Sequence, residues 1–345
     1  MLRREEILSW LRETDPSRLA ELYARADAVR KAHVGEEVHL RGLVEISNYC
    51  VQNCAYCGLR RENAEAHRYR MQADEVVACA HEAARRGYGT IVLQSGEDYG
   101  LTREWTCGII ARIKAETPLA LTLSFGERPA GDFAAWRAAG ADRYLLKFET
   151  SDDALYKELH PPLPDKHYSR RDMLPALTDM GYEAGSGVMI GLPGQSFDTL
   201  ANDLLLFREL KLDMIGAGPF LPHPQTPLGT EYADAIRAGD QVPSTGEMGY
   251  KVIALTRLLC PNTNIPATTA LASLNRETGR RLALQRGANV VMPNLTPAAY
   301  RRYYEIYPEK LCFYEEAAFE HEQIMQLLAD IGRPAGRGPG SRSGG

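Results

Sequence analysis

The stretch Asn48-Tyr49-Cys50-Val51-Gln52-Asn53-Cys54-Ala55-Tyr56-Cys57-Gly58-Leu59-Arg60 places three cysteines in one short loop, at Cys-x3-Cys-x2-Cys spacing. It follows the apolar run Leu43-Val44-Glu45-Ile46, which is typical of a buried strand. Structural zinc and closed iron–sulfur sites use four protein ligands, whereas three thiolates leave one metal position open. The spacing therefore predicts a [4Fe–4S] cluster with one iron free to bind a small molecule. A zinc knuckle completed by His67 and a loop without metal are the alternatives.

The composition is that of a globular enzyme, with 345 residues, 44% of them hydrophobic and 25% charged. A net charge of −5 gives no electrostatic reason to expect nucleic acid or an anionic membrane as a partner. Seven cysteines, three of them in one loop, favour a reducing compartment over a disulfide framework. The first residues have no long apolar segment of the secretory type. We therefore expect a cytoplasmic protein.

Eight short apolar runs alternate with amphipathic helical stretches from about residue 38 onward. This alternation predicts an α/β fold, a complete (β/α)8 TIM-type barrel, and a doubly wound open sheet is the alternative. The predicted strands are Val38–Ser47, Thr90–Gln94, Ala120–Phe125, Arg143–Phe148, Glu183–Ile190, Met214–Gly218, Asn264–Thr269 and Ala288–Met292.

The flanking segments divide the chain into four parts. Residues 1–36 contain two predicted helices, 3–13 and 16–34, that would pack on a barrel formed by residues 37–311. Closing helices are expected at 297–307 and 315–331, so residues 312–332 are assigned as a C-terminal helix. Residues 333–345 are Gly, Pro, Ser and Arg with little apolar surface, and we expect them to be disordered.

The three cysteines, with Tyr56 before the last of them, resemble the radical S-adenosylmethionine (SAM) superfamily. The resemblance implies that S-adenosyl-L-methionine chelates the open iron and is cleaved by one electron to methionine and a 5′-deoxyadenosyl radical. It also implies that Tyr56 packs on the adenine and that Gly96 and Glu97, after the second strand, lie near the SAM amino group. A glycine-rich run at 185–195 resembles the segment beside the adenine.

Longer stretches resemble one branch of the superfamily, the [FeFe]-hydrogenase maturases of the HydE family, more closely than methylornithine synthase or biotin synthase. The resemblance runs from about residue 35 to 312, and the stretches that carry it are 46–50, 57–63, 90–98, 218–224, 264–270 and 292–294. It implies a substrate that is an iron complex bearing cysteine, CO and cyanide, attacked at the cysteine sulfur during H-cluster assembly. The implied partners are other hydrogenase maturases and an electron donor such as a ferredoxin or flavodoxin.

Carried over position by position, the resemblance assigns two sets of site residues. Those around SAM are Gln94, Glu149, Arg170, Met214, Met292 and Tyr304. Those at the substrate end are Arg41, Ser95, Arg143, Thr268, Thr269, Ala270 and Tyr307. Arginines suit an anionic complex that carries cyanide and carboxylate groups. Met214 and Met292 would equally serve as core fillers.

The chain departs from the family pattern at three places. Glu320 and Gln323 replace two of the three cysteines that hold a second cluster in some members, leaving Cys312, so we expect one cluster. Lys147-Phe148 stands where the family pattern has Arg-His, and the loop after Ala270 also differs. These changes keep open a radical amino-acid mutase similar to methylornithine synthase and, more remotely, a non-catalytic iron–sulfur sensor or scaffold.

Overall fold

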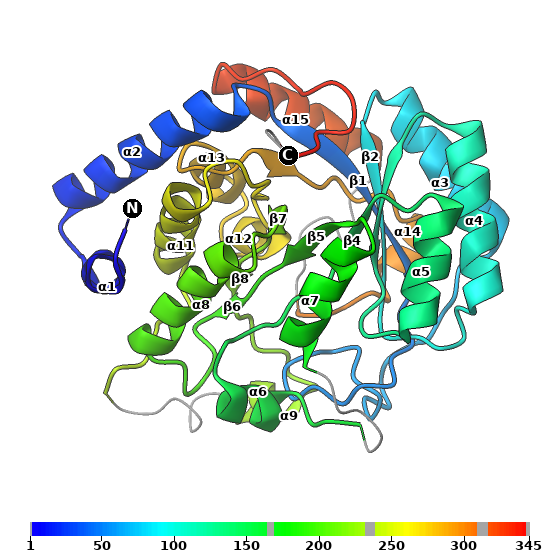
Figure 1. Cartoon of the computed structure of the whole chain (residues 1–345), viewed down its shortest axis with the longest axis horizontal. Coiled ribbons are helices and arrows are strands. Elements are labelled where there is room, and N and C mark those ends of the chain that lie inside the picture. The colour runs from blue at the N-terminus through cyan, green and yellow to red at the C-terminus, as the bar shows by residue number, and fades with distance from the viewer. Residues whose placement is uncertain (1, 164–168, 232–238, 309–316, 343–345) are drawn as a thin grey trace.

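A curled parallel sheet with helices on its outside forms the body of the molecule (Figure 1). The computed structural model describes residues 2–163, 169–231, 239–308 and 317–342. The sheet has seven strands in the order β7-β5-β4-β3-β2-β1-β9, and a two-stranded sheet of β6 and β8 lies beyond β5 and β7 along the chain. The strands are β1 (His39–Ser47), β2 (Thr90–Ser95), β3 (Ala120–Ser124), β4 (Arg143–Leu145), β5 (Glu183–Ser186), β6 (Met189–Ile190), β7 (Met214–Ile215), β8 (Gly218–Pro219) and β9 (Val290–Val291).

The strand order follows the chain around the sheet, so there is no switch point of the kind that defines a doubly wound fold. The seventh of the eight predicted strands, Asn264–Thr269, does not form a strand in the structure. Asn264 bridges Met214 and Pro266 bridges Val290, each as an isolated pair. Pro266 has no N–H with which to extend a ladder. The structure therefore shows a seven-stranded curled sheet and not a complete eight-stranded barrel.

Helices cover the outer face of the sheet and the N-terminal pair packs against two of them. Helix α1 contacts α8, and α2 contacts α11. Asp15 caps α2 by accepting from the Ser17 and Arg18 amides, with Pro16 in the first turn. The helices are α1 (Arg4–Arg12), α2 (Pro16–Val34), α3 (Ala73–Arg85), α4 (Arg103–Glu116), α5 (Ala130–Ala139), α6 (Asp153–Leu159), α7 (Arg170–Asp179), α8 (Phe197–Glu209), α9 (Pro227–Thr230), α11 (Gly246–Leu259), α12 (Thr269–Leu274), α13 (Gly279–Leu284), α14 (Ala298–Arg301) and α15 (Ala317–Asp330). None of the helices in the described ranges is long and apolar enough to cross a membrane.

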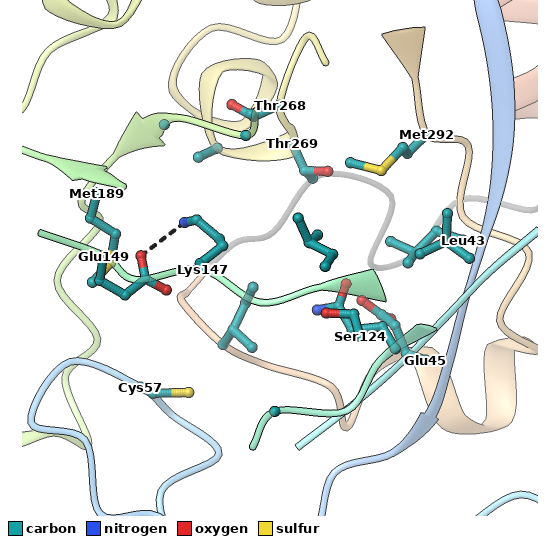
Figure 2. Close-up of a pocket in the computed structure, with 18 of the residues that line it drawn as sticks. Leu43, Glu45, Cys57, Ser124, Lys147, Glu149, Met189, Thr268, Thr269 and Met292 are labelled. Atoms are coloured by element: carbon teal, nitrogen blue, oxygen red, sulfur yellow. Dashed lines mark ion pairs between the residues drawn. The ribbon is translucent and has the colours of Figure 1, made fainter. Parts of the chain in front are cut away.

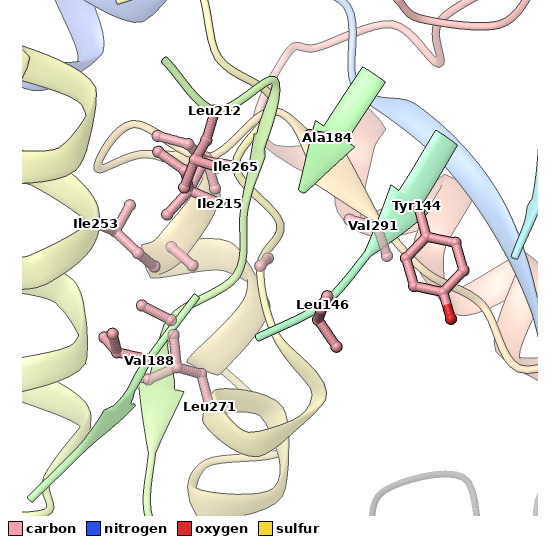
Figure 3. Close-up of a cluster of buried hydrophobic side chains, with 14 of the residues drawn as sticks. Tyr144, Leu146, Ala184, Val188, Leu212, Ile215, Ile253, Ile265, Leu271 and Val291 are labelled. Atoms are coloured by element: carbon pink, nitrogen blue, oxygen red, sulfur yellow. The ribbon is translucent and has the colours of Figure 1, made fainter. Parts of the chain in front are cut away.

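The hydrophobic core lies between the sheet and these helices. Figure 3 shows Ile253 of α11 directed toward Ile215 at the end of β7 and Ile265 beside it. All three side chains are at most 2% exposed. Burying one such side chain contributes about 1.5–3 kcal/mol, so this contact fixes α11 against the short strands.

The C-terminal segment is ordered further than its composition predicts. The Val38 amide donates to the Pro334 carbonyl at 2.9 Å, and the Gly336 amide donates to the Val38 carbonyl at 2.8 Å. Gly340 has φ +57°, and a Cβ there would lie 2.5 Å from the His39 ring. Glycine is therefore used here for a close approach to the barrel, and the expectation of disorder is wrong for residues 333–342. The predicted C-terminal helix is described from Ala317 onward, and Cys312 lies outside the described residues.

One buried carboxylate couples helix α8 to the loop that follows β4. Asp203 accepts from the Ser151 amide at 2.5 Å and from the Gln195 side-chain amide at 3.2 Å. Burial raises the pKa of Asp203 from 3.8 to about 7. A carboxyl that holds its proton more tightly in the folded state gives stability that is lost as pH rises through the folded-state pKa.

We predict that part of the pH dependence of stability disappears in Asp203→Asn. The contribution of this group to the wild-type free energy of unfolding should fall between pH 4 and pH 7, because the unfolded chain ionises Asp203 in this range while the folded state keeps it protonated. Urea unfolding of wild type and Asp203→Asn across this pH range gives the slope of the free energy of unfolding against pH for each protein. Asp198→Asn, on the more exposed side of the same helix, is the control. Equal slopes for wild type and Asp203→Asn would contradict the assignment.

Candidate active site

A cavity of about 380 Å³ lies inside the curled sheet, and residues from most of its strands line it. In parallel α/β folds, reactive groups gather at the carboxyl ends of the strands. The sequence-predicted residues that line this cavity are Arg41, Cys50, Cys54, Tyr56, Cys57, Gln94, Ser95, Gly96, Glu97, Glu149, Arg170, Met214, Thr268, Thr269, Ala270, Met292, Tyr304 and Tyr307. Arg143 is the predicted site residue that is absent from the lining.

The cysteine loop is anchored by two polar side chains, one from within the loop and one from the segment that follows it. The Asn48 side-chain amide donates to the carbonyls of His67 and Tyr303, both at 2.7 Å. Arg68 donates to the carbonyls of Asn48, Leu59 and Arg60. These contacts hold both ends of the loop to the rest of the protein.

Three thiols from this loop face one cavity, as a cluster requires. The Glu97 amide donates to the Cys50 sulfur at 3.3 Å, and such amide contacts tune iron–sulfur clusters. Burial, followed by repulsion from Cys50, raises the pKa of Cys57 to about 12, so a bound metal would have to supply the charge that keeps it a thiolate. The donor set and its burial fit a cluster held by three protein thiolates.

The zinc alternative has no support in the geometry. His67 stacks on Tyr303 at 4.1 Å between ring centroids and does not line the cavity. Within the described ranges, no three His, Cys, Asp or Glu side chains lie close enough to hold a single metal ion. That result is compatible with a cluster, because each cysteine of a cubane binds a different iron.

The segment after β2 supports the cysteine loop. A Cβ on Gly96 would lie 2.2 Å from the Tyr49 carbonyl oxygen, so a side chain does not fit there. The Glu97 carboxylate accepts from the Gln52 side chain and the Glu127 amide, both at 3.0 Å. Glu97 thus links this segment to the loops after β1 and β3, and a contact from Glu97 to SAM stays a prediction.

Arg170 opens α7 and is surrounded by partners that the sequence reasoning missed. Its guanidinium donates to Glu127 at 2.9 Å and to the Lys147 carbonyl at 2.9 Å, and lies 2.8 Å from the His160 ring nitrogen. Glu127 follows the third strand, so the strand-end rule applied to the second, fourth and fifth strands would have found it. His160 follows α6 and carries no comparable signal.

The end of β4 carries an ion pair in a strained backbone. Lys147 Nζ lies 3.0 Å from Glu149 Oε2, as Figure 2 shows. Glu149 has φ +65°, a conformation that costs a non-glycine residue energy and is common at functional sites. Phe148 points the other way and packs on Phe207, with ring centroids 5.7 Å apart. Of the two residues that differ from the family pattern here, Lys147 lines the cavity and Phe148 does not.

The opposite end of the cavity is lined by polar residues around Arg41. Figure 2 places Thr268, Thr269 and Met292 at this end, away from Cys57, with Lys147 and Glu149 between. Arg41 is 4% exposed, donates to the Met214 sulfur at 3.0 Å, and its Nε has no hydrogen-bond partner in the described part of the chain. Burial, followed by repulsion from Arg143, lowers the pKa of Arg41 to about 9.

Arg143 is not among the residues that line the cavity, and its role as a substrate residue stays a prediction. As the first residue of β4 it lies at the amino-terminal end of the sheet, below the cavity. It is fully buried and forms an ion pair with Glu183 at 2.6 Å. The neighbouring strand therefore already supplies its counter-charge.

A buried carboxylate in the cavity, Glu45, was also missed. It accepts from the Asn294 side-chain amide at 3.1 Å, and the Asn294 backbone amide donates to Glu320 at 2.9 Å. Glu320 is itself buried and pairs with Arg280 at 2.5 Å. A carboxylate within the apolar run 43–46 was the available signal for Glu45. The Glu320 ion pair with Arg280 ties α15 to α13.

Comparisons with known proteins agree with this geometry. Residues 44–207 match the model of the radical SAM superfamily. The chain is 44% identical to the [FeFe] hydrogenase maturase subunit HydE of Thermotoga maritima, over 93% of this chain and 88% of that protein. This chain belongs to the radical SAM superfamily. It is a HydE-like enzyme, and its family implies a [4Fe–4S] cluster and SAM.

More distant relatives share the fold. The 3-methylornithine synthase of Methanosarcina acetivorans is 28% identical, over 79% of this chain and 74% of that protein. The crystal structure of methylornithine synthase (PylB) superimposes with a TM-score of 0.82 at 23% identity, over 98% of this chain and 95% of that one. The X-ray structure of the FeFe-hydrogenase maturase HydG from Carboxydothermus hydrogenoformans superimposes with a TM-score of 0.77 at 19% identity, over 96% of this chain and 75% of that one.

We predict that Gly96→Ala disturbs the cysteine loop. The added methyl group would overlap the Tyr49 carbonyl and approach the Cys50 Cβ at 3.0 Å, and such overpacking costs about 1–3 kcal/mol. Iron bound after anaerobic reconstitution should fall below wild type. Gly108→Ala, which meets open space on α4, is the matched control. Full iron content in Gly96→Ala would show that the segment does not support the loop.

Proposed function

We propose that this enzyme acts in [FeFe]-hydrogenase H-cluster assembly, on the cysteine sulfur of an organometallic iron precursor. The observation that carries the proposal is the 44% identity to a HydE over 88% of its length, together with three thiols, Glu149 and Arg170 around one cavity. When bound, the cluster and SAM would supply a 5′-deoxyadenosyl radical as the oxidising group.

In this proposal the end of the cavity nearest the cysteines receives SAM. Cys50, Cys54 and Cys57 hold the cluster, and Gln94 is oriented by its 3.2 Å contact to the Tyr304 hydroxyl. Glu149 accepts from the ribose or ammonium of SAM. The remaining residues assigned to SAM are Tyr56, Gly96, Glu97, Arg170, Met214 and Met292.

The far end of the cavity receives the substrate. Arg41 supplies cationic donors to an anionic complex, and Thr268, whose hydroxyl has no hydrogen-bond partner in the described structure, supplies another donor. Ser95, Thr269, Ala270 and Tyr307 complete this set. Lys147, paired with Glu149 between the two ends, adds positive charge where the SAM and substrate sites meet.

We further propose one cluster per chain, because Glu320 is committed to its ion pair with Arg280. The enzyme would work in the cytosol with other hydrogenase maturases and a ferredoxin or flavodoxin as electron donor. The runner-up is a radical amino-acid mutase, favoured by the 28% identity to 3-methylornithine synthase and by the departure at Lys147.

We predict that Cys57→Ser binds iron poorly and releases no 5′-deoxyadenosine from SAM with dithionite. Wild type should bind about four irons per chain, because a single cubane contains four. Cys107→Ser is the control, since Cys107 lies on α4 outside the cavity. About eight irons in wild type would contradict the single cluster, and SAM cleavage by Cys57→Ser would contradict the cluster assignment.

A second prediction separates the two candidate functions. With SAM and reductant, the enzyme should consume a cysteine-containing iron carbonyl cyanide complex and leave lysine unchanged. Mass spectrometry of the small molecules measures both reactions. Formation of methylornithine from lysine would overturn the maturase proposal, while leaving the radical SAM assignment in place.

A further inference from the structure

The C-terminal segment 335–342 crosses the amino-terminal end of the sheet, opposite the cysteine loop. It contacts residues at or just before the start of four strands: His39 of β1, Gly89 before β2, Arg143 of β4 and Asp213 before β7. Figure 1 shows the C-terminus at this end. The contacts therefore run across the sheet and not along one edge of it.

Two tail carbonyls accept four hydrogen bonds from the barrel. The Pro339 carbonyl accepts from Thr90 Oγ1 at 2.9 Å and from Arg143 Nη2 at 3.0 Å. The Gly340 carbonyl accepts from Arg41 Nη2 and Asn264 Nδ2, both at 3.0 Å. All four donors belong to buried residues, and losing an acceptor costs about 1–3 kcal/mol for each buried donor left without a partner.

The Gly340 carbonyl lies behind the cavity lining, because it accepts from Arg41 and Asn264, which both line the cavity, whereas no residue of 335–342 does. Two glycines make this approach possible. A Cβ on Gly89 would lie 1.5 Å from the Gly338 carbonyl oxygen, and Gly340 passes the His39 ring with φ +57°. The close contact thus depends on one glycine before a strand, Gly89, and on one glycine in the tail, Gly340.

We infer that residues 335–342 back the floor of the cavity, behind Arg41 and Asn264, and close a second entrance at its amino-terminal end. The floor sets how deep a bound substrate can reach, and it keeps water from the end opposite SAM. This inference concerns the shape of the cavity and holds for any substrate, so it stands apart from the maturase proposal.

The sharpest perturbation is Gly89→Ala, because its methyl group displaces the tail without touching the tail sequence or the cavity lining. Deletion of residues 337–345 removes the same contacts while keeping the pairing of Val38 with Gly336. Gly108→Ala is the matched control.

Thr122→Cys provides the reporter. Thr122 lines the cavity, pairs with Arg143 in the β3–β4 register, is 1% exposed, and its hydroxyl has no hydrogen-bond partner in the described residues. A thiol at this position therefore breaks no hydrogen bond and lies near the proposed floor.

The experiment measures alkylation of the reporter by iodoacetamide under anaerobic conditions, in protein carrying its cluster and SAM, by peptide mass spectrometry. We expect labelling to be about tenfold faster or more in Gly89→Ala and in the deletion, and unchanged in Gly108→Ala. Combining Gly89→Ala with the deletion should add nothing further.

Equal labelling rates with and without the tail would overturn the inference. The inference would also be overturned if Gly89→Ala still accelerated labelling in full in the protein that lacks residues 337–345. Its effect could not then arise from displacement of the tail. Neither result depends on turnover of the substrate, so failure here is distinguishable from failure of the maturase proposal.

Discussion

Parallel strand pairing is the constraint on which the rest of this structure depends. Because the seven strands of the curled sheet run in one direction, their carboxyl ends meet at the same rim. Residues far apart in sequence, such as Cys50, Glu149 and Thr268, therefore line one cavity. The amino-terminal ends meet at the opposite rim for the same reason, which brings His39, Thr90 and Arg143 together under the tail.

Charge inside the cavity is balanced by pairs rather than by solvent. Arg170 is held by Glu127 and Lys147 by Glu149, so two cations near the cysteine end have carboxylate partners within 3.0 Å. Arg41 at the far end has a thioether and a peptide carbonyl as acceptors. A buried guanidinium with neutral acceptors favours an anion more strongly than one already paired. The geometry thus distinguishes the two ends of the cavity electrostatically.

The sequence was sufficient to predict most of the sheet and most of the cavity lining, because both depend on local patterns. Apolar runs located the strands of the sheet, and the rule that site residues follow strands located the cysteines, Gln94 and Glu149. Arg143 was assigned through the family resemblance and not through this rule; it begins its strand and is not among the cavity-lining residues. The rule could not find His160, which reaches Arg170 from a helix end. The predicted strand Asn264–Thr269 is reduced to two isolated bridges, and Pro266 has no N–H with which to extend them into a ladder.

The tail shows why composition alone misjudges order. A segment rich in glycine has too little apolar surface to fold by itself, and the expectation of disorder rests on that fact. Here the barrel supplies what the tail lacks, namely buried donors on three strands and the 264–266 segment that require acceptors. Peptide carbonyls can meet that need without side chains, and glycine lets them approach closely. The same residues that suggest disorder in isolation are the ones that fit a polar floor.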